Sequence, residues 1–141
     1  IIVMHTLGCT SDPALKRRTL DWAVMGTDVK LQDFFYPIGA VSSSLNGADL
    51  SWNYYKENLD HIKAKLSKSV PALMDAVIVN SIGVFCTLER AQEIDDYFTA
   101  NPIPKSAMRI SQVVESIRIS GHMLVRVRES QLTQPSFWNA D

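Results

Sequence analysis

Apolar residues recur along this chain with the period of an α-helix, and no stretch alternates with the period of two that a half-buried strand requires. The clearest run contains Ala48, Trp52, Tyr55, Leu59, Ile62 and Leu66, with successive spacings of 4, 3, 4, 3 and 4. Residues at these spacings share one face of a helix. The sequence therefore predicts an all-α fold, with Trp52 on its best apolar face.

Start and stop signals divide the sequence into successive helices. Asp12-Pro13 predicts a helix start. The Asp12 carboxylate can accept hydrogen bonds from the free N–H groups of the first turn, and at Pro13 a backbone N–H would have no partner within the helix, so its absence costs nothing. Thr87 and Ser106 are further candidate caps, and Asn46-Gly47 predicts a turn. The predicted helices cover residues 12–25, 31–45, 47–66, 71–84, 87–100 and 106–129.

These helices fall into three successive pairs, a pattern that favours a HEAT- or armadillo-like solenoid of antiparallel helix pairs. A compact bundle is the alternative. The helix at 72–84 is apolar almost all round, so we expect it to be buried on several sides. Residues 1–132 are predicted to form one helical-repeat domain, and the polar tail 133–141 is expected to fray. The apolar opening at Ile1 suggests a helix cut from a longer protein.

No pattern in the sequence predicts a catalytic or metal-binding residue, or a cofactor. A zinc hydrolase site needs clustered ligands, but the histidines His5, His61 and His122 stand alone and H-E-x-x-H is absent. Cys9 and Cys86 are predicted to be buried thiols in a reducing compartment, hence a cytoplasmic location. A net charge of -1 favours neither nucleic acid nor an anionic membrane as a partner.

The predicted last helix concentrates positive charge, and two interpretations of that charge remain open. The arginines concerned are Arg109, Arg118, Arg126 and Arg128. They form either a solvated face paired with Glu115 and Glu129, or a positive wall that faces the carboxylate of a peptide. For the second interpretation the candidate peptide contacts are Arg109, Arg118 and Arg126.

One glycine of the last helix lies in an apolar stripe. Gly121 follows Ile110, Val114 and Ile117 on that stripe, although glycine weakens a helix interior. We therefore expect a preceding helix to approach closely at Gly121.

Several short segments occur in an order that resembles a known family. They are Leu7-Gly8-Cys9-Thr10-Ser11-Asp12-Pro13, Val29-Lys30-Leu31-Gln32-Asp33, Asn46-Gly47, Ser51-Trp52, Lys56-Glu57-Asn58, Ala91-Gln92-Glu93-Ile94, Phe98, Asn101-Pro102-Ile103-Pro104, Arg109, Gln112, Glu115, Ile117 and Arg128-Glu129-Ser130. Over roughly residues 5–132 the chain resembles the C-terminal helical domain of puromycin-sensitive aminopeptidases. These belong to the zinc aminopeptidase family, which also holds alanyl and antigen-trimming aminopeptidases.

The resemblance implies a parent enzyme that removes N-terminal residues from peptides with a zinc domain earlier in its chain. It also implies a curved helical domain that walls the substrate chamber and limits the access of peptides to the zinc. The partners would be the catalytic domain of the same chain and peptide substrates. The family's zinc ligands have no counterpart here, so no catalytic residue is transferred. The rival hypothesis is a free-standing helical-repeat adaptor that binds another protein.

Overall fold

The computed structural model describes residues 2–138, and these residues contain helices and no strand. The α-helices are α1 (Ile2–Gly8), α2 (Pro13–Val24), α3 (Phe35–Ser42), α4 (Gly47–Glu57), α5 (Leu59–Leu66), α6 (Pro71–Ile82), α7 (Leu88–Ala100), α8 (Ala107–Glu129) and α9 (Pro135–Trp138). Short 3-10 turns cover Leu31–Asp33, Pro104–Ser106 and Gln131–Thr133. The predicted all-α class is confirmed. Ile1 and the end of the predicted frayed tail, 139–141, lie outside the described residues.

Two of the three predicted caps are confirmed. The Asp12 carboxylate accepts a hydrogen bond from the backbone N–H of Ala14 at 2.8 Å. Thr87 accepts from the N–H of Arg90 at 3.3 Å and so begins α7. The prediction for Ser106 is wrong, because a 3-10 turn precedes α8 and the Ser106 side chain makes no capping bond. Its hydroxyl is buried and has no hydrogen-bond partner among the described residues.

The predicted helix 47–66 is divided at Asn58 into α4 and α5. Asn58 leaves the helical conformation, with φ of -117° and ψ of 17°, and its amide donates to the carbonyl of Tyr54 at 2.9 Å. An asparagine side chain that bonds to a nearby backbone group competes in this way with helix continuation. The apolar face nevertheless continues across the break, since Trp52 and Leu59 on either side are both buried.

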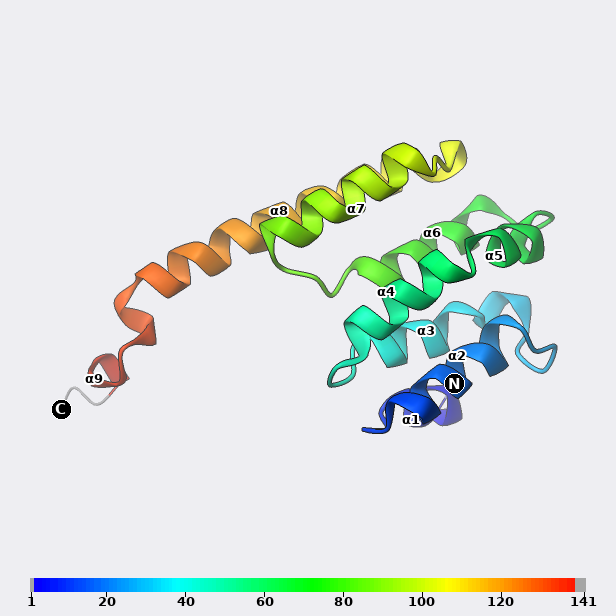
Figure 1. Cartoon of the computed structure of the whole chain (residues 1–141), viewed down its shortest axis with the longest axis horizontal. Helices are drawn as coiled ribbons and strands as arrows, with labels where there is room; N and C mark the ends of the chain where they lie inside the picture. Colours follow the sequence, from blue (N-terminus) through cyan, green and yellow to red (C-terminus); the bar gives the residue numbers. More distant parts are fainter. Residues whose placement is uncertain (1, 139–141) are drawn as a thin grey trace.

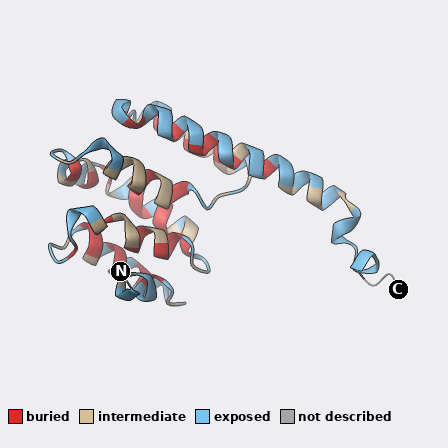
Figure 2. Ribbon diagram, turned by 180° about the vertical axis from the view of Figure 1, so that it is seen from behind, coloured by how far each residue is buried: buried red, intermediate tan, exposed pale blue. Residues whose placement is uncertain are grey.

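The helices are arranged in two layers (Figure 1). In one layer α1 packs on α3, α3 on α6, and α6 on α8. In the other, α2 packs on α4, and side chains of α4 bond to side chains of α7. Figure 2 shows that the buried residues lie where the helices face one another. The expectation for the apolar helix at 72–84 is confirmed, because α6 contacts α3, α4, α5 and α8.

Trp52 is the largest side chain of the core. It is 0% exposed, as its place on the apolar face predicts. Its ring stacks on Tyr55 with centroids 5.6 Å apart, and meets Tyr97 of α7 edge-on at 4.9 Å. Such aromatic pairs add to the stability gained from apolar burial. Trp52 therefore joins α4 to α7 across the centre of the molecule.

Helix α8 is longer than any helix it packs against. Near its middle, a Cβ added to Gly121 would lie 2.9 Å from Leu88 Cδ2 and 3.0 Å from the Leu88 nitrogen. The expected close approach at Gly121 is therefore confirmed, and the neighbour is the first residue of α7. Beyond Gly121, α8 extends past the other helices, a part we call the α8 overhang (residues 122–129; Figures 1 and 2).

The prediction that both cysteines are buried is wrong. Cys9 and Cys86 are free thiols, and both are exposed. Cys86 lies between α6 and α7, where Phe85 rather than Cys86 packs against the core. Cys9 directly follows the last residue of α1. An apolar sequence neighbourhood therefore misled the prediction, because both thiols lie in connections and not on the inner face of a helix.

Among residues 2–138, every helix is too short or too polar to cross a lipid bilayer.

Candidate functional site

A cleft of about 270 Å³ lies between α6 and α8. One wall consists of Arg109, Gln112, Ser116 and Ser120, which we call the α8 polar row. Their spacings of 3, 4 and 4 place all four on one face of α8. The opposite wall is formed by Val79 and Gly83 of the α6 end and by Phe85. The cleft therefore combines hydrogen-bonding groups on one side with an apolar surface on the other.

Arg109 is the only charged residue that lines this cleft among the described part of the chain. Its side chain is exposed, and Nη1 donates to Gln112 Oε1 at 3.3 Å. No acidic group within residues 2–138 forms an ion pair with it. A guanidinium has five N–H donors, so most of those on Arg109 are available to a ligand.

A second cleft, of about 230 Å³, lies between α3 and α6 beside α1. Asn80 of α6, Tyr36 of α3, Ser43 directly after α3, and His5 of α1 contribute polar groups to its lining. Asn80 lies three residues before Gly83, which directly follows α6, so the two clefts lie near each other at this end of the helix. Together they form a surface rich in hydroxyl, amide and ring donors and acceptors.

The structure does not bring the other predicted arginines to this cleft. Arg118 lies nine residues beyond Arg109, about 180° further round the helix axis. It pairs with Asp95 of α7 at 2.6 Å and lies 3.9 Å from Glu115. Arg126 and Arg128 are exposed on the α8 overhang, where the described residues include no ion pair with Glu129. The predicted Glu115 partner is thus found for Arg118 alone.

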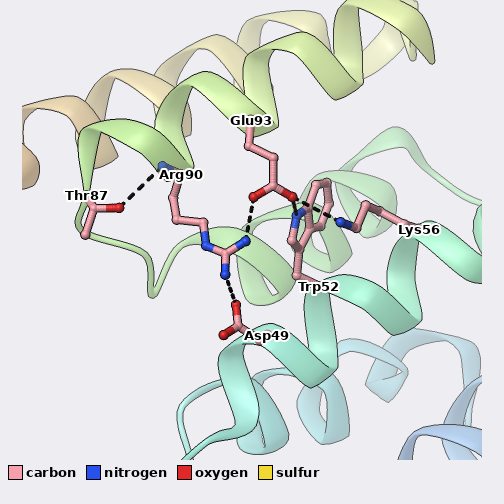
Figure 3. A network of polar contacts seen from close by, with 6 residues as sticks. All are labelled: Asp49, Trp52, Lys56, Thr87, Arg90 and Glu93. Carbon is pink, nitrogen blue, oxygen red and sulfur yellow. Dashed lines mark hydrogen bonds and ion pairs between the residues drawn. The ribbon is translucent and has the colours of Figure 1, made fainter.

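The position of α8 depends on a polar joint between α7 and α4 (Figure 3). Glu93 of α7 accepts hydrogen bonds from Trp52 Nε1 at 2.9 Å and from Lys56 Nζ at 3.0 Å. Arg90 bonds to Glu93 and also to Asp49 of α4. We call these five residues the Glu93 joint. It ties the α7–α8 hairpin to the rest of the fold.

The Glu93 joint lowers the pKa of its central carboxyl group. Partial burial alone would raise the pKa of Glu93, but hydrogen bonds from Trp52, Lys56 and Arg90 outweigh that effect. They lower its pKa to about 2. Sequence analysis gave Glu93 no structural role and missed the joint. The available signal was Trp52, because a buried indole N–H normally requires an acceptor.

Within residues 2–138, no group of three or more histidine, cysteine, aspartate or glutamate side chains is arranged to hold a metal ion. The three histidines have different surroundings: His5 contacts the Tyr36 ring, and His61 and His122 lie on separate helices.

Comparison with known proteins gives a consistent result. The family model of the ERAP1-like C-terminal domain matches residues 1–119. Aminopeptidase M1-B of Oryza sativa subsp. japonica is 31% identical over 108 residues, which cover 76% of this chain and 12% of that protein. The alanine/arginine aminopeptidase of Saccharomyces cerevisiae is 26% identical over 129 residues, covering 92% of this chain and 15% of its own length.

Aminopeptidase M1 of Arabidopsis thaliana is 23% identical over 133 residues, which cover 94% of this chain and 15% of that protein. The chain therefore spans between 12% and 15% of the length of these relatives.

Proposed function

The chain belongs to the ERAP1-like C-terminal domain family, and on this basis we propose that it is the non-catalytic C-terminal domain of a zinc-dependent aminopeptidase. The parent enzyme would remove N-terminal residues from peptides in the cytoplasm. Its zinc and its catalytic residues would belong to another part of the same protein. The names of the relatives support the aminopeptidase activity, because all three are aminopeptidases.

We propose that the two helix layers are one end of a HEAT-like solenoid. Support comes from the order of packing, because successive helices, with α4 and α5 counted as one, alternate between the layers and contact their neighbours within each layer. Stacked helix pairs of this kind bury their apolar faces against one another and leave an extended surface. That surface would wall the substrate chamber and face the catalytic domain.

The observation that carries the peptide-contacting role is Arg109, which lines the cleft between α6 and α8 and forms no ion pair within residues 2–138. A guanidinium suits a peptide carboxylate, because it donates two parallel hydrogen bonds to the two oxygens. Gln112, Ser116 and Ser120 provide uncharged donors and acceptors, which suit the backbone of any peptide. The distal end of a peptide would therefore lie along α8, with its C-terminus at Arg109. For Arg118 and Arg126 a peptide contact stays a prediction.

The test uses the full-length protein and a peptide of about ten residues, with either a free or an amidated C-terminus. Arg109→Ala should raise KM for the free acid about tenfold or more, the value of a lost charge-assisted hydrogen bond. It should leave kcat, and also KM for the amidated peptide, nearly unchanged. Arg128→Ala is the matched control, because Arg128 is exposed and does not line the cleft. An unchanged KM for the free acid would overturn the role of Arg109.

The second candidate is a free-standing adaptor that binds another protein. The α8 overhang and the segment after it favour this function, because Met123, Val125, Leu132, Phe137 and Trp138 are exposed. The natural reading frame separates the candidates. An H-E-x-x-H motif encoded upstream of Ile1 supports the aminopeptidase, and a frame without a further domain supports the adaptor.

A further inference from the structure

The connection between α6 and α7 forms part of the apolar wall of the cleft between α6 and α8. It covers residues 83–87, and two of these residues, Gly83 and Phe85, line the cleft. Phe85 is the only aromatic residue of the lining among residues 2–138. It is half-buried and packs against the edge of the core. The position of Phe85 therefore helps to set the shape of the candidate peptide site.

The backbone of this connection is attached at its two ends. The N–H of Gly83 donates to the carbonyl of Val79 at 2.8 Å, and the N–H of Phe85 donates to that of Ile82 at 3.2 Å. At the other end the side chain of Thr87 caps α7. The orientation of the Phe85 ring is therefore set by the side chains around it, because the backbone bonds fix only the path of the chain.

A guanidinium group lies over the Phe85 ring. Arg90 Cζ is 5.0 Å from the centroid of this ring, within the distance of about 6 Å that a cation–π contact requires. Arg90 lies in the first turn of α7, five residues after Phe85. Its own side chain is held in place, because it bonds to Glu93 and to Asp49 of α4 (Figure 3). Arg90 therefore belongs to the Glu93 joint and also contacts the wall of the cleft.

We infer that Arg90 is a positioning residue of the candidate peptide site. It holds Phe85 in place at the cleft, where Phe85 would contact apolar parts of a peptide whose C-terminus lies at Arg109. Arginine suits this role, because its planar group stacks on an aromatic face while its N–H groups bond to carboxylates. The inference rests on the proposed function, since Phe85 contacts a peptide only if peptides occupy this cleft.

The first test compares KM with kcat in the full-length protein. Arg90→Met should raise KM for a peptide of about ten residues about threefold or more, the value of a lost cation–π contact, and should change kcat little. Both constants should stay unchanged for an aminoacyl fluorogenic substrate, which has no distal end. Arg90→Lys should restore part of the loss, because it keeps a positive charge near the ring. An unchanged KM for the peptide in Arg90→Met would overturn the inference.

Lys56→Met is the matched control. Lys56 also bonds to Glu93, at 3.0 Å, and its Nζ lies 5.1 Å from the centroid of the Trp52 ring, but Lys56 does not line the cleft. This variant therefore weakens the Glu93 joint without removing the contact with Phe85, and it should leave KM for the peptide unchanged. An equal rise of KM in Lys56→Met and Arg90→Met would count against the inference, because the joint as a whole would then control the cleft.

A double-mutant cycle tests whether Arg90 acts through Phe85. Phe85→Leu keeps an apolar side chain but removes the aromatic face. In this background Arg90→Met should change KM by less than about twofold, because the contact is already lost. Additive effects of the two substitutions on KM would show that Arg90 acts by another route and would overturn the inference. Circular dichroism melts check that each variant is folded.

Arg109→Ala, measured in the same assay, separates this inference from the proposed function. If KM rises in Arg109→Ala but not in Arg90→Met, the positioning role of Arg90 is wrong and the peptide contact of Arg109 stands. If KM rises in Arg90→Met and the cycle shows coupling to Phe85, but Arg109→Ala has no effect, the positioning role stands and the contact of Arg109 is wrong. If neither variant changes KM, both are wrong.

Discussion

Glu93 shows how one carboxylate joins two helices that are distant in sequence. Its neighbours include a buried indole and two cations, and the indole has no other acceptor. Because all three donors bond more strongly to the ionised carboxylate than to the neutral acid, the joint couples the protonation of Glu93 to the strength of the contact between α4 and α7.

The pKa of Glu93 predicts how stability depends on pH. Its folded value of about 2 lies below the ordinary 4.5, so ionisation favours the folded state. The contribution is complete above about pH 4.5 and is lost as the pH falls toward 2. Because the side chain is 38% exposed and screened by solvent, we expect only about 1 kcal/mol.

Urea denaturation of wild type and Glu93→Gln at pH 7, 5, 4 and 3 measures this contribution. The stability difference between the two proteins should shrink as the pH falls through this range. Glu57→Gln is the control, because Glu57 lies in an exposed pair elsewhere on α4. A difference that stays constant with pH would show that Glu93 is not the titrating group.

The burial of some individual side chains could not be predicted from the sequence. Lys16 is 1% exposed, and its Nζ donates to the Leu45 carbonyl across the loop between α3 and α4. Its neighbour Leu15 is exposed, although leucine is the residue of the two that is normally buried. Lys16 faces inward because the loop between α3 and α4 passes over this side of α2. A local sequence pattern contains no information on the path of that loop. Ser106 and Cys86 were misassigned for reasons of the same kind, because the 3-10 turn before α8 and the path of the connection between α6 and α7 are not contained in a local pattern.

At the scale of elements, Gly121 offers a direct test of how α7 packs on α8. Gly121→Leu should destabilise the protein by about 1–3 kcal/mol, because the side chain would displace Leu88 and the start of α7. Gly121→Ala should be milder, since its gain of up to about 1 kcal/mol in helix propensity offsets the tight contact.

Thermal melts of both variants measure the effect, with Ser120→Ala as a neighbouring control on the cleft side of α8. If both substitutions stabilise the protein in order of helix propensity, the contact with Leu88 is not present in solution.

The helices themselves were largely predictable, because their signals are local. Asp12-Pro13 and Thr87 marked two helix starts correctly, and the spacing around Trp52 identified the central buried face. The break at Asn58 was missed, because the apolar period continues through it while a side-chain-to-backbone bond interrupts the helix. The nine-residue spacing of Arg109 and Arg118 places them on opposite faces of α8, but sequence alone gave no distances between elements and so did not show which face borders the cleft.

For the whole molecule, the absence of clustered ligands among residues 2–138 leads to a functional prediction. The 141-residue chain should hold no stoichiometric zinc and should not release product from aminoacyl fluorogenic substrates. Metal analysis and a fluorescence assay measure both, with the full-length protein as the positive control. About one tightly bound zinc per chain, with hydrolysis that stops on chelation, would contradict the non-catalytic role.

The α8 overhang makes the α7–α8 hairpin a lever. The pair of Arg118 with Asp95 ties α8 to α7 beside the Glu93 joint, and the contact of Gly121 with Leu88 is followed by the eight residues of the overhang. At the rise of an α-helix this is about 12 Å of rod beyond the last contact with α7. A tilt of about 10° at that point displaces the tip by about 2 Å on this geometry. A small change in the angle between α7 and α8 would therefore move the end of α8 further than it moves the contact at Gly121.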